Sequence, residues 1–255
     1  MSEKPVILVT NDDGIKAPGL RCLIRVMREF GDVLVVAPDK PQSGMGHAIT
    51  IHFPLRLVEV QIDGHSEYEC SGTPVDCVKL AVNKILHRKP DLCVSGINHG
   101  QNSSVNVIYS GTMSAAVEGA IEGIPSIGFS LLDHSVDADF SEAEDVVRTV
   151  VRKVMKEGLP SGTCLNVNIP RKTAEPIKGI KVCRQALARY EEEFEERTDP
   201  MGHPYYWLTG VFKNYDHGED TDEWALSHHY VLVVPVQFDM TAHHGLPFLN
   251  QWDFE

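Results

Sequence analysis

Two patterns of apolar and polar positions alternate along the first 170 residues. Short runs rich in β-branched side chains predict strands buried on both faces, and longer stretches with apolar residues three or four positions apart predict helices. This alternation predicts an α/β protein with a mostly parallel sheet and helices on both faces. The predicted strands cover residues 6–10, 33–37, 91–95, 125–131 and 164–169, and the predicted helices cover 20–30, 75–86, 113–122 and 141–157.

The first predicted strand ends in acidic residues. Asn11, Asp12, Asp13 and Gly14 follow its last apolar position. In an open α/β sheet, ligands bind in the crevice outside the carboxyl ends of the strands. Two adjacent carboxylates repel each other there and favour a cation, and their hard oxygens suit Mg²⁺, Mn²⁺ or Ca²⁺. The alternative is an ordinary turn or helix cap, for which the same residues are good formers.

Polar loops follow two further strands. The loop 39–46 carries Ser43, and the glycine-rich loop after strand 91–95 carries Asn98 and Asn102. Because carboxyl ends of parallel strands lie at one edge of a sheet, Asn98 and Asn102 are expected in the same crevice as Asp12 and Asp13.

A second feature of these loops is the start of the helix 113–122. The hydroxyl groups of Ser110 and Thr112, together with the free amides there, predict a cradle for a phosphate group. Ordinary helix capping explains the same hydroxyl groups, and one residue can do both.

Local signals place other boundaries. Thr73 and Pro74 predict the start of helix 75–86, and Ser141 with Glu144 predicts a capping box for helix 141–157. Alternating residues over 49–62 predict antiparallel strands, with 68–70 able to pair with them.

The pattern changes after about residue 170. We expect strands at 180–188 and 230–236, a short helix near 224–226, an acidic solvated run at 190–197 and an aromatic half-hairpin at 204–212. An extended aromatic hairpin with little helix nearby buries itself poorly in a monomer, so we expect it to pack on a partner subunit. The chain is therefore divided into 1–170 and 171–255.

Composition narrows the class of partner and compartment. The 255 residues carry a net charge of −13, which argues against a nucleic-acid polymer or an anionic membrane as the main partner. No apolar run approaches the ~20 residues of a membrane span, and the apolar run at the amino terminus is too short for a signal peptide. Six scattered cysteines without a C-x-x-C pair predict reduced core thiols. A cytoplasmic protein is expected.

Six stretches in one order make the sequence similar to a known family. It resembles the SurE family of metal-dependent 5′-nucleotidases, also called survival proteins, over essentially its whole length. The stretches are VTNDDGIKAPG at 9–19, VVAPDKPQSG at 35–44, SGTPVDCV at 71–78, SGINHGQN at 95–102, YSGTMSAAVEG at 109–119 and TDPMGHPYYWLTG at 198–210.

The resemblance implies a Rossmann-like metal- and substrate-binding domain over 1–170. It further implies a β-hairpin-rich oligomerisation extension over 171–255, exchanged between the subunits of a homodimer or tetramer. The implied activity is hydrolysis of nucleoside monophosphates with one divalent cation, Mg²⁺ or Mn²⁺, per subunit. The implied metal ligands are Asp12, Asp13, Ser43 and Asn98, and the candidates for holding the phosphate are Asn102, Ser110, Gly111 and Thr112.

Two positions depart from the usual family pattern. Ser104 and Asn106 stand where the family usually has Gly and Asp. The predicted metal ligands are unaffected, but a neutral Asn106 removes a negative charge near an anionic substrate.

Several points of chemistry stay open at the level of sequence. Either Asp12 or Asp13 attacks phosphorus directly, or a metal-bound water attacks, and His99 is a candidate to protonate the leaving ribose oxygen. Three other classes of protein share some of these features. A haloacid-dehalogenase-type phosphatase requires D-x-D, which adjacent acids do not provide. A nucleotide sensor without turnover would use the same cleft, and a purely structural oligomer leaves the polar loops unexplained.

Overall fold

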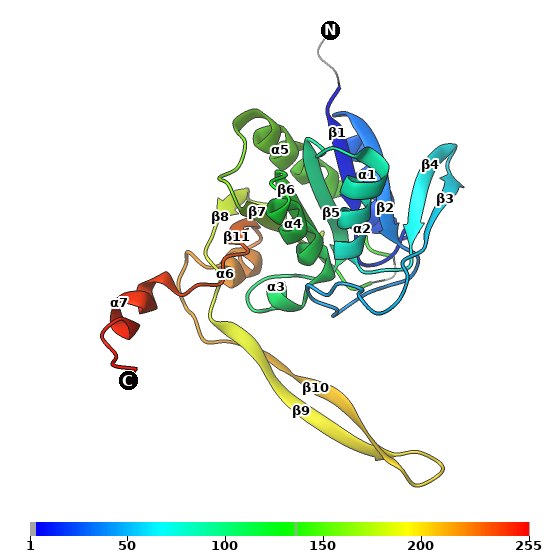
Figure 1. Cartoon of the computed structure of the whole chain (residues 1–255). Helices are drawn as coiled ribbons and strands as arrows, with labels where there is room; N and C mark the ends of the chain where they lie inside the picture. Colours follow the sequence, from blue (N-terminus) through cyan, green and yellow to red (C-terminus); the bar gives the residue numbers. More distant parts are fainter. Residues whose placement is uncertain (1–3, 136, 255) are drawn as a thin grey trace.

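The computed structural model describes residues 4–135 and 137–254 (Figure 1). Within this part of the chain a nine-stranded sheet runs in the order β3-β4-β2-β1-β5-β6-β7-β11-β8. All neighbours are parallel except the pairs β3–β4 and β7–β11. The strands are β1 (Val6–Thr10), β2 (Asp32–Pro38), β3 (Leu57–Ile62), β4 (His65–Cys70), β5 (Leu92–His99), β6 (Ser126–Leu132), β7 (Thr163–Pro170), β8 (Ile180–Val182) and β11 (Val231–Gln237).

Helices cover both faces of the sheet, as predicted. Alternate residues of β1 point to opposite faces, so Ile7 and Val9 pack in the core beneath α1 (Pro18–Met27) and α5 (Ser141–Glu157). Leu8 packs in a second core beneath α2 (Pro74–Leu80) and its π-helical continuation η1 (Ala81–Leu86). The helix α4 (Gly111–Ile121) lies beside α2 on this second face. The mostly parallel α/β architecture is confirmed.

The predicted helix boundaries are only partly right. The first helix was expected at 20–30, but α1 begins at Pro18, whose fixed φ suits a first turn, and ends at Met27. Gly31 serves packing rather than termination, because a Cβ there would lie 2.2 Å from the carbonyl oxygen of Pro5. Thr73 caps α2 through a complete capping box with Asp76, which confirms that start.

The capping box predicted for α5 is wrong. Phe140 is the N-cap residue and makes no side-chain cap, while Ser141 is already helical and donates its backbone N–H to Asp139. Glu144 instead pairs with Arg25 of α1 and with Arg148 one turn along. Here one ion pair between the two helices and one within α5 replace the local cap.

Two strand predictions are also corrected. Residues 49–56 form no strand, and only Leu57–Ile62 pairs with β4. The strand expected at 180–188 is limited to Ile180–Val182, because Arg184 turns away and exchanges backbone hydrogen bonds with Asp220 and Asp222.

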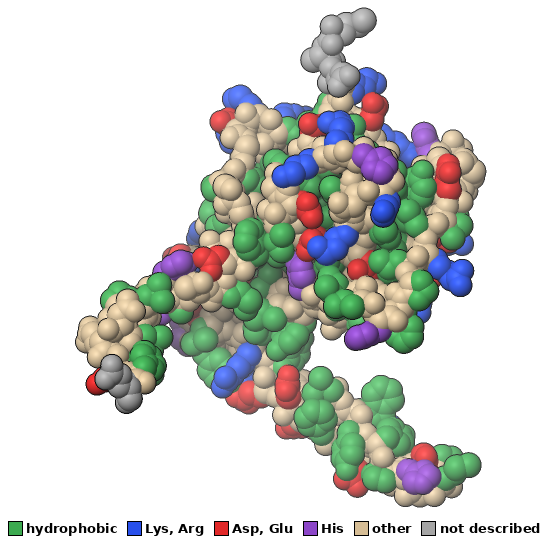
Figure 2. All heavy atoms as spheres, viewed as in Figure 1, with side chains coloured by type: hydrophobic (Ala, Val, Ile, Leu, Met, Phe, Trp, Pro, Cys, Tyr) green, Lys and Arg blue, Asp and Glu red, His purple; other side chains and the backbone are tan. Residues whose placement is uncertain are grey.

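A long hairpin projects from the body. The acidic run predicted as a solvated face lies in β9 (Ala188–Thr198), which pairs in antiparallel register with β10 (Pro204–Asn214), the predicted aromatic half-hairpin. It extends into solvent on the side of α3 (Asn106–Tyr109) and carries many hydrophobic side chains (Figures 1 and 2). The remaining elements are α6 (Asp222–Ser227), η2 (His243–Gly245) and α7 (Leu246–Leu249).

The main sheet continues beyond residue 170, since β8 and β11 belong to it. The division into 1–170 and 171–255 therefore stays a prediction. All six cysteines are buried and free, as expected for core thiols. None of the helices in the described part of the chain is long and apolar enough to cross a membrane.

Candidate metal centre and substrate cleft

One cavity of about 390 Å³ lies at the carboxyl ends of β1 and β5, which are neighbours in the sheet. The aspartates follow the last residue of β1, while Asn98 belongs to β5 itself. This cavity brings together six of the eight predicted site residues, namely Asp12, Asp13, Ser43, Asn98, Asn102 and Ser110. Residues far apart in the sequence thus meet at one edge of the sheet.

Asp12 is the most enclosed member of the site, with 4% of its surface exposed. The Thr112 hydroxyl donates a hydrogen bond to its Oδ1 from the first turn of α4. Gly111 permits this approach, because a Cβ there would lie 2.7 Å from the Cβ of Asp12. Gly111 and Thr112 therefore lie beneath Asp12 and do not line the cavity. Their predicted contact with substrate stays a prediction, and Thr112 holds the carboxylate in place.

The two carboxylates are electrostatically costly in the metal-free protein. Burial raises the pKa of Asp12 to about 6, against the hydrogen bond from Thr112 and with a further contribution from Asp13. Burial also raises the pKa of Asp13, although the backbone N–H of His99 donates to it. A divalent cation between the two would relieve this cost. The donor set therefore fits a hard cation.

The two neutral candidates complete a set of oxygen ligands. The side-chain amide of Asn98 donates from Nδ2 to the carbonyl of Gly100 at 2.9 Å, which leaves its Oδ1 for a cation. Ser43 is exposed on the loop after β2, and this loop is joined to the site because Gln42 donates its N–H to the carbonyl of Asp12 at 2.7 Å. Over residues 4–135 and 137–254, no cluster of three or more His, Cys, Asp or Glu side chains is placed to hold a metal. The candidate set has two carboxylates and two neutral oxygens.

The loop carrying Ser43 is held at its far end by a buried carboxylate. Glu118 of α4 is 2% exposed, and its Oε2 lies 2.9 Å from Nε2 of His47 on the loop. Lys79 of α2 pairs with the other oxygen of Glu118. A second tie joins the Thr50 hydroxyl to Asp76 at 2.6 Å. The loop is therefore anchored to both α2 and α4.

Asn102 is fixed by a buried network of amides. Its backbone N–H donates to Asn168 Oδ1 at 2.6 Å, and its Nδ2 donates to Ser130 Oγ at 2.8 Å. Asn166 donates in turn to the carbonyl of Asn102. These partners come from β6 and β7, so the loop after β5 is held against the next two strands, and Asn102 Oδ1 is left for a ligand.

Ser110 and His99 place polar atoms in the wall of the cavity. Ser110 is the N-cap of α4 and accepts a hydrogen bond from the N–H of Met113 at 3.0 Å, as the capping alternative requires. Its hydroxyl hydrogen remains available to a phosphate oxygen. The ring of His99 packs edge-on against Phe140 with centroids 5.1 Å apart, and this contact orients the imidazole in the cavity wall.

Several residues of this wall, Tyr109 among them, are not predicted from the sequence. His134, Tyr190 and Phe212 also line the cavity. Tyr190 and Phe212 face each other across the root of the hairpin, with ring centroids 5.2 Å apart. The sequence does suggest that the acidic run pairs with the aromatic half-hairpin. This pairing places Tyr190 and Phe212 at the site only when the direction in which the hairpin leaves the body is known.

The root of the hairpin is fastened to the site loop by Ser104, one of the two departures from the family pattern. Ser104 has a φ of 53°, which glycine adopts more readily. Its hydroxyl lies 2.8 Å from the carbonyl of Ala186 and 2.9 Å from that of Ala188. The buried carboxylate of Asp222 accepts the N–H groups of both Ser104 and Ala186. The hairpin therefore leaves the body from a fixed base beside the cavity.

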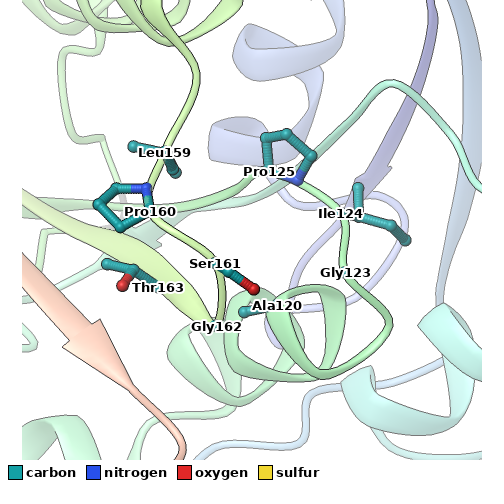
Figure 3. A pocket seen from close by; sticks show the side chains of 9 residues that line it. All are labelled: Ala120, Gly123, Ile124, Pro125, Leu159, Pro160, Ser161, Gly162 and Thr163. Carbon is teal, nitrogen blue, oxygen red and sulfur yellow. The ribbon is translucent and has the colours of Figure 1, made fainter.

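A separate hollow of about 220 Å³ lies at the opposite edge of the sheet, just before β6 and β7 (Figure 3). Its lining holds no titratable side chain: Ala120, Gly123, Ile124, Pro125, Leu159, Pro160, Ser161, Gly162 and Thr163. It lacks the groups that acid–base or metal chemistry requires.

The fold and site define a class: an α/β protein whose first parallel strand presents two adjacent carboxylates, beside neutral oxygen donors, in a cleft at the carboxyl edge of the sheet. The family model described as "Survival protein SurE" matches residues 7–192. The chain belongs to the SurE family.

Individual relatives match over nearly full length. The 5′-nucleotidase SurE of Christiangramia forsetii is 65% identical over 253 residues, which cover 98% of this chain and 97% of that protein. The 5′-nucleotidase SurE of Phocaeicola vulgatus is 48% identical over 255 residues, or 99% and 98% of the two chains. The crystal structure of the SurE protein from Aquifex aeolicus has a TM-score of 0.84 at 41% identity and covers 96% of this chain and 98% of that one.

Proposed function

We propose that the protein hydrolyses nucleoside monophosphates to nucleoside and inorganic phosphate in the cleft at the carboxyl ends of β1 and β5. The chain is a 5′-nucleotidase of the SurE family, in keeping with the names of relatives 48–65% identical to it. The observation that carries the assignment to this cleft is the meeting of Asp12, Asp13, Ser43 and Asn98 in one cavity. These four would hold one Mg²⁺ or Mn²⁺ per subunit.

A bound divalent cation would neutralise charge on the transferring phosphoryl group and polarise a bound water. The residues of the chain hold the reactants around that centre. Asp12 is fixed by Thr112, and Asp13 is the more exposed of the two acids. If a carboxylate attacks phosphorus, Asp13 is the accessible one; if water attacks, Asp13 is placed to orient it. Ser110 and Asn102 supply polar atoms for the phosphate oxygens, and His99 stands in the wall to protonate the departing ribose oxygen.

The charges around the cleft favour a single phosphate group. A second hollow adjoins this cavity along the hairpin and shares Tyr109 and Tyr190 with it. Among the described residues, those that line the cavity and this second hollow include no lysine or arginine. A second or third phosphate would therefore find no cationic side chain, and the nearby carboxylate of Glu192 would repel it. Nucleoside monophosphates are expected to be better substrates than triphosphates or polyphosphate.

Self-association and location complete the proposal. Phe194, Trp207 and Leu208 on the hairpin are 66%, 56% and 61% exposed, which is a large apolar surface for a free hairpin (Figure 2). We therefore propose a homodimer or tetramer in which the hairpin region is exchanged or packed between subunits.

Six buried free thiols are in keeping with a cytoplasmic location.

The test is phosphate release from a panel of nucleoside monophosphates with Mg²⁺, with Mn²⁺ and with a chelator. We expect metal-dependent release that falls by roughly 100-fold or more in Asp13→Asn, since removal of one group acting directly on the transition state typically costs that much. The rival function is a nucleotide sensor in the same cleft. Nucleotide binding by native protein, without release of phosphate under any metal, would overturn the assignment in favour of the sensor.

A further inference from the structure

The cavity at the carboxylates continues into a second hollow along the hairpin. This second hollow has a volume of about 580 Å³. The two share four lining residues, Gly44, Asn106, Tyr109 and Tyr190. A phosphomonoester bound with its phosphate at Asp12 and Asp13 can therefore extend into this second hollow, over α3 and the hairpin root. Its leaving group would then lie against the hairpin.

Aromatic rings line this direction. Tyr109 is 56% exposed and Tyr190 is 50% exposed, although both lie at the junction of the hollows. Phe212 packs edge-on against Tyr190 and is itself half-buried. Exposed aromatic faces beside a polar site are a stacking surface for a planar ligand, and every nucleobase has such a face.

The hairpin is hollowed where a base would rest. By the strand register, Tyr190 lies opposite Phe212 and Glu192 opposite Gly210, so these four residues belong to one face of the hairpin. Gly210 adds no side chain to that face, and its φ of +145° excludes most other residues. The resulting gap lies directly beside the tyrosine ring, within the lining of the second hollow.

The position of these rings relative to the carboxylates is fixed. The loop 100–105 follows β5, which carries Asn98 next to its last residue, and Ser104 on this loop binds the backbone of Ala186 and Ala188. Tyr190 follows only two residues later in β9. The same loop leads into α3, which carries Asn106 and Tyr109. One short loop therefore sets the spacing between the phosphate end and the aromatic end of the cleft.

We propose that Tyr190 and Phe212, with Tyr109 at the junction of the two hollows, form the subsite that stacks on the nucleobase, so that the hairpin determines the specificity of the enzyme. The proposal rests on the proposed function, since it assigns the leaving-group end of that same cleft. The hairpin then has a second role besides self-association: its root recognises the substrate, while its distal part carries the exposed apolar surface.

The test compares a nucleoside monophosphate with glycerol phosphate, a phosphomonoester without a ring. The variants are Tyr190→Ala and Phe212→Ala, with Tyr190→Phe to keep the stacking ring. The matched control is Tyr206→Ala, because Tyr206 lies on the same hairpin, is 57% exposed and lines neither hollow. Values of kcat and KM are measured for both substrates, and size-exclusion chromatography checks that the assembly is unchanged.

The expected result is a fall in kcat/KM for the nucleotide of roughly 10-fold or more in Tyr190→Ala, mainly through KM, with glycerol phosphate turnover changed by less than about 2-fold. Tyr206→Ala should match native protein, and Tyr190→Phe, which keeps the stacking ring, should lose much less nucleotide turnover than Tyr190→Ala. Two results overturn the proposal: nucleotide turnover unchanged in both alanine variants, or equal losses for both substrates, which would mean a structural role. Absence of phosphate release from either substrate by native protein would instead refute the proposed function.

Discussion

Thr112 donates a hydrogen bond from its Oγ1 to Oδ1 of the buried Asp12, joining the first turn of α4 to the end of β1. The bond favours the ionised carboxylate in a place where burial disfavours it. Because a cation binds the ionised form, Thr112 controls the pH range in which the site can be filled.

Thr112→Val removes the donor while keeping the shape of the side chain. A hydrogen bond to a charged group contributes about 1.5–3 kcal/mol, so the pKa of Asp12 should rise above about 6 by roughly one to two units. Mn²⁺ affinity, measured by calorimetry from pH 5 to 9, should then begin to fall at a higher pH than in native protein. Thr112→Ser should behave as native. An equal loss of affinity at every pH would contradict this role.

Asp12→Asn should stabilise the metal-free protein above pH 6. The pKa of Asp12 is raised in the folded state from 3.8 to about 6, so its ionisation opposes folding. The gain from the substitution should be absent below pH about 4, grow between pH 4 and 6, and then stay constant at up to about 3 kcal/mol. Urea unfolding in the presence of a chelator measures it. A variant that is less stable than native protein at pH 8 would refute this reading of the buried charge.

Two substitutions at Ser104 should separate backbone strain from the hydroxyl contacts. Ser104→Gly relieves the positive φ but removes the bonds to Ala186 and Ala188, so global stability should change by less than about 1 kcal/mol. Ser104→Ala removes the same bonds and keeps the strain, and should cost about 1–2 kcal/mol. The backbone N–H of Ala188 donates to the Ser104 hydroxyl oxygen at 3.2 Å, so hydrogen exchange at this N–H should accelerate in both variants. Unchanged protection at that amide would show that the hydroxyl does not hold the hairpin root.

The tie between His47 and Glu118 should matter for metal binding, whereas the tie between Lys79 and Glu118 should not. Only His47 belongs to the loop that carries Ser43. We expect His47→Ala to weaken Mn²⁺ binding by roughly 3- to 10-fold, with kcat at saturating metal almost unchanged. The substitution removes one hydrogen bond that orders the loop, and the free energy of about one such bond corresponds to this change in affinity. Lys79→Ala is the matched control and should bind as native protein does. Equal effects of both variants would mean that Glu118 acts on the helices and not on the loop.

Much of the site follows from short-range sequence patterns. A buried apolar run followed at once by Asp12 and Asp13 predicts a site, because the carboxyl ends of parallel strands lie at one edge of the sheet. The same logic places Asn98 beside them. The metal-ligand set beyond this came from the family resemblance, and the structure is in keeping with it by gathering those residues in one cavity.

The features that escaped prediction depend on contacts between distant elements. Ser141 and Glu144 match a capping box, but Glu144 pairs with Arg25 of α1 instead, since packing of two helices outweighs a local cap. The contact of Thr112 with a phosphate stays a prediction, and only the approach of α4 to β1 reveals that its hydroxyl donates to Asp12. The role of Tyr190 depends on the hairpin's register and direction, which no local pattern specifies.

The decisive experiment is a crystal structure of the protein grown with Mn²⁺, with anomalous scattering used to locate the ion. The account predicts one peak per subunit, within coordination distance of oxygen atoms from Asp12, Asp13, Ser43 and Asn98, and no peak there in Asp12→Asn crystals grown alike. A peak held by other residues, or none between the two aspartates at saturating Mn²⁺, would contradict it.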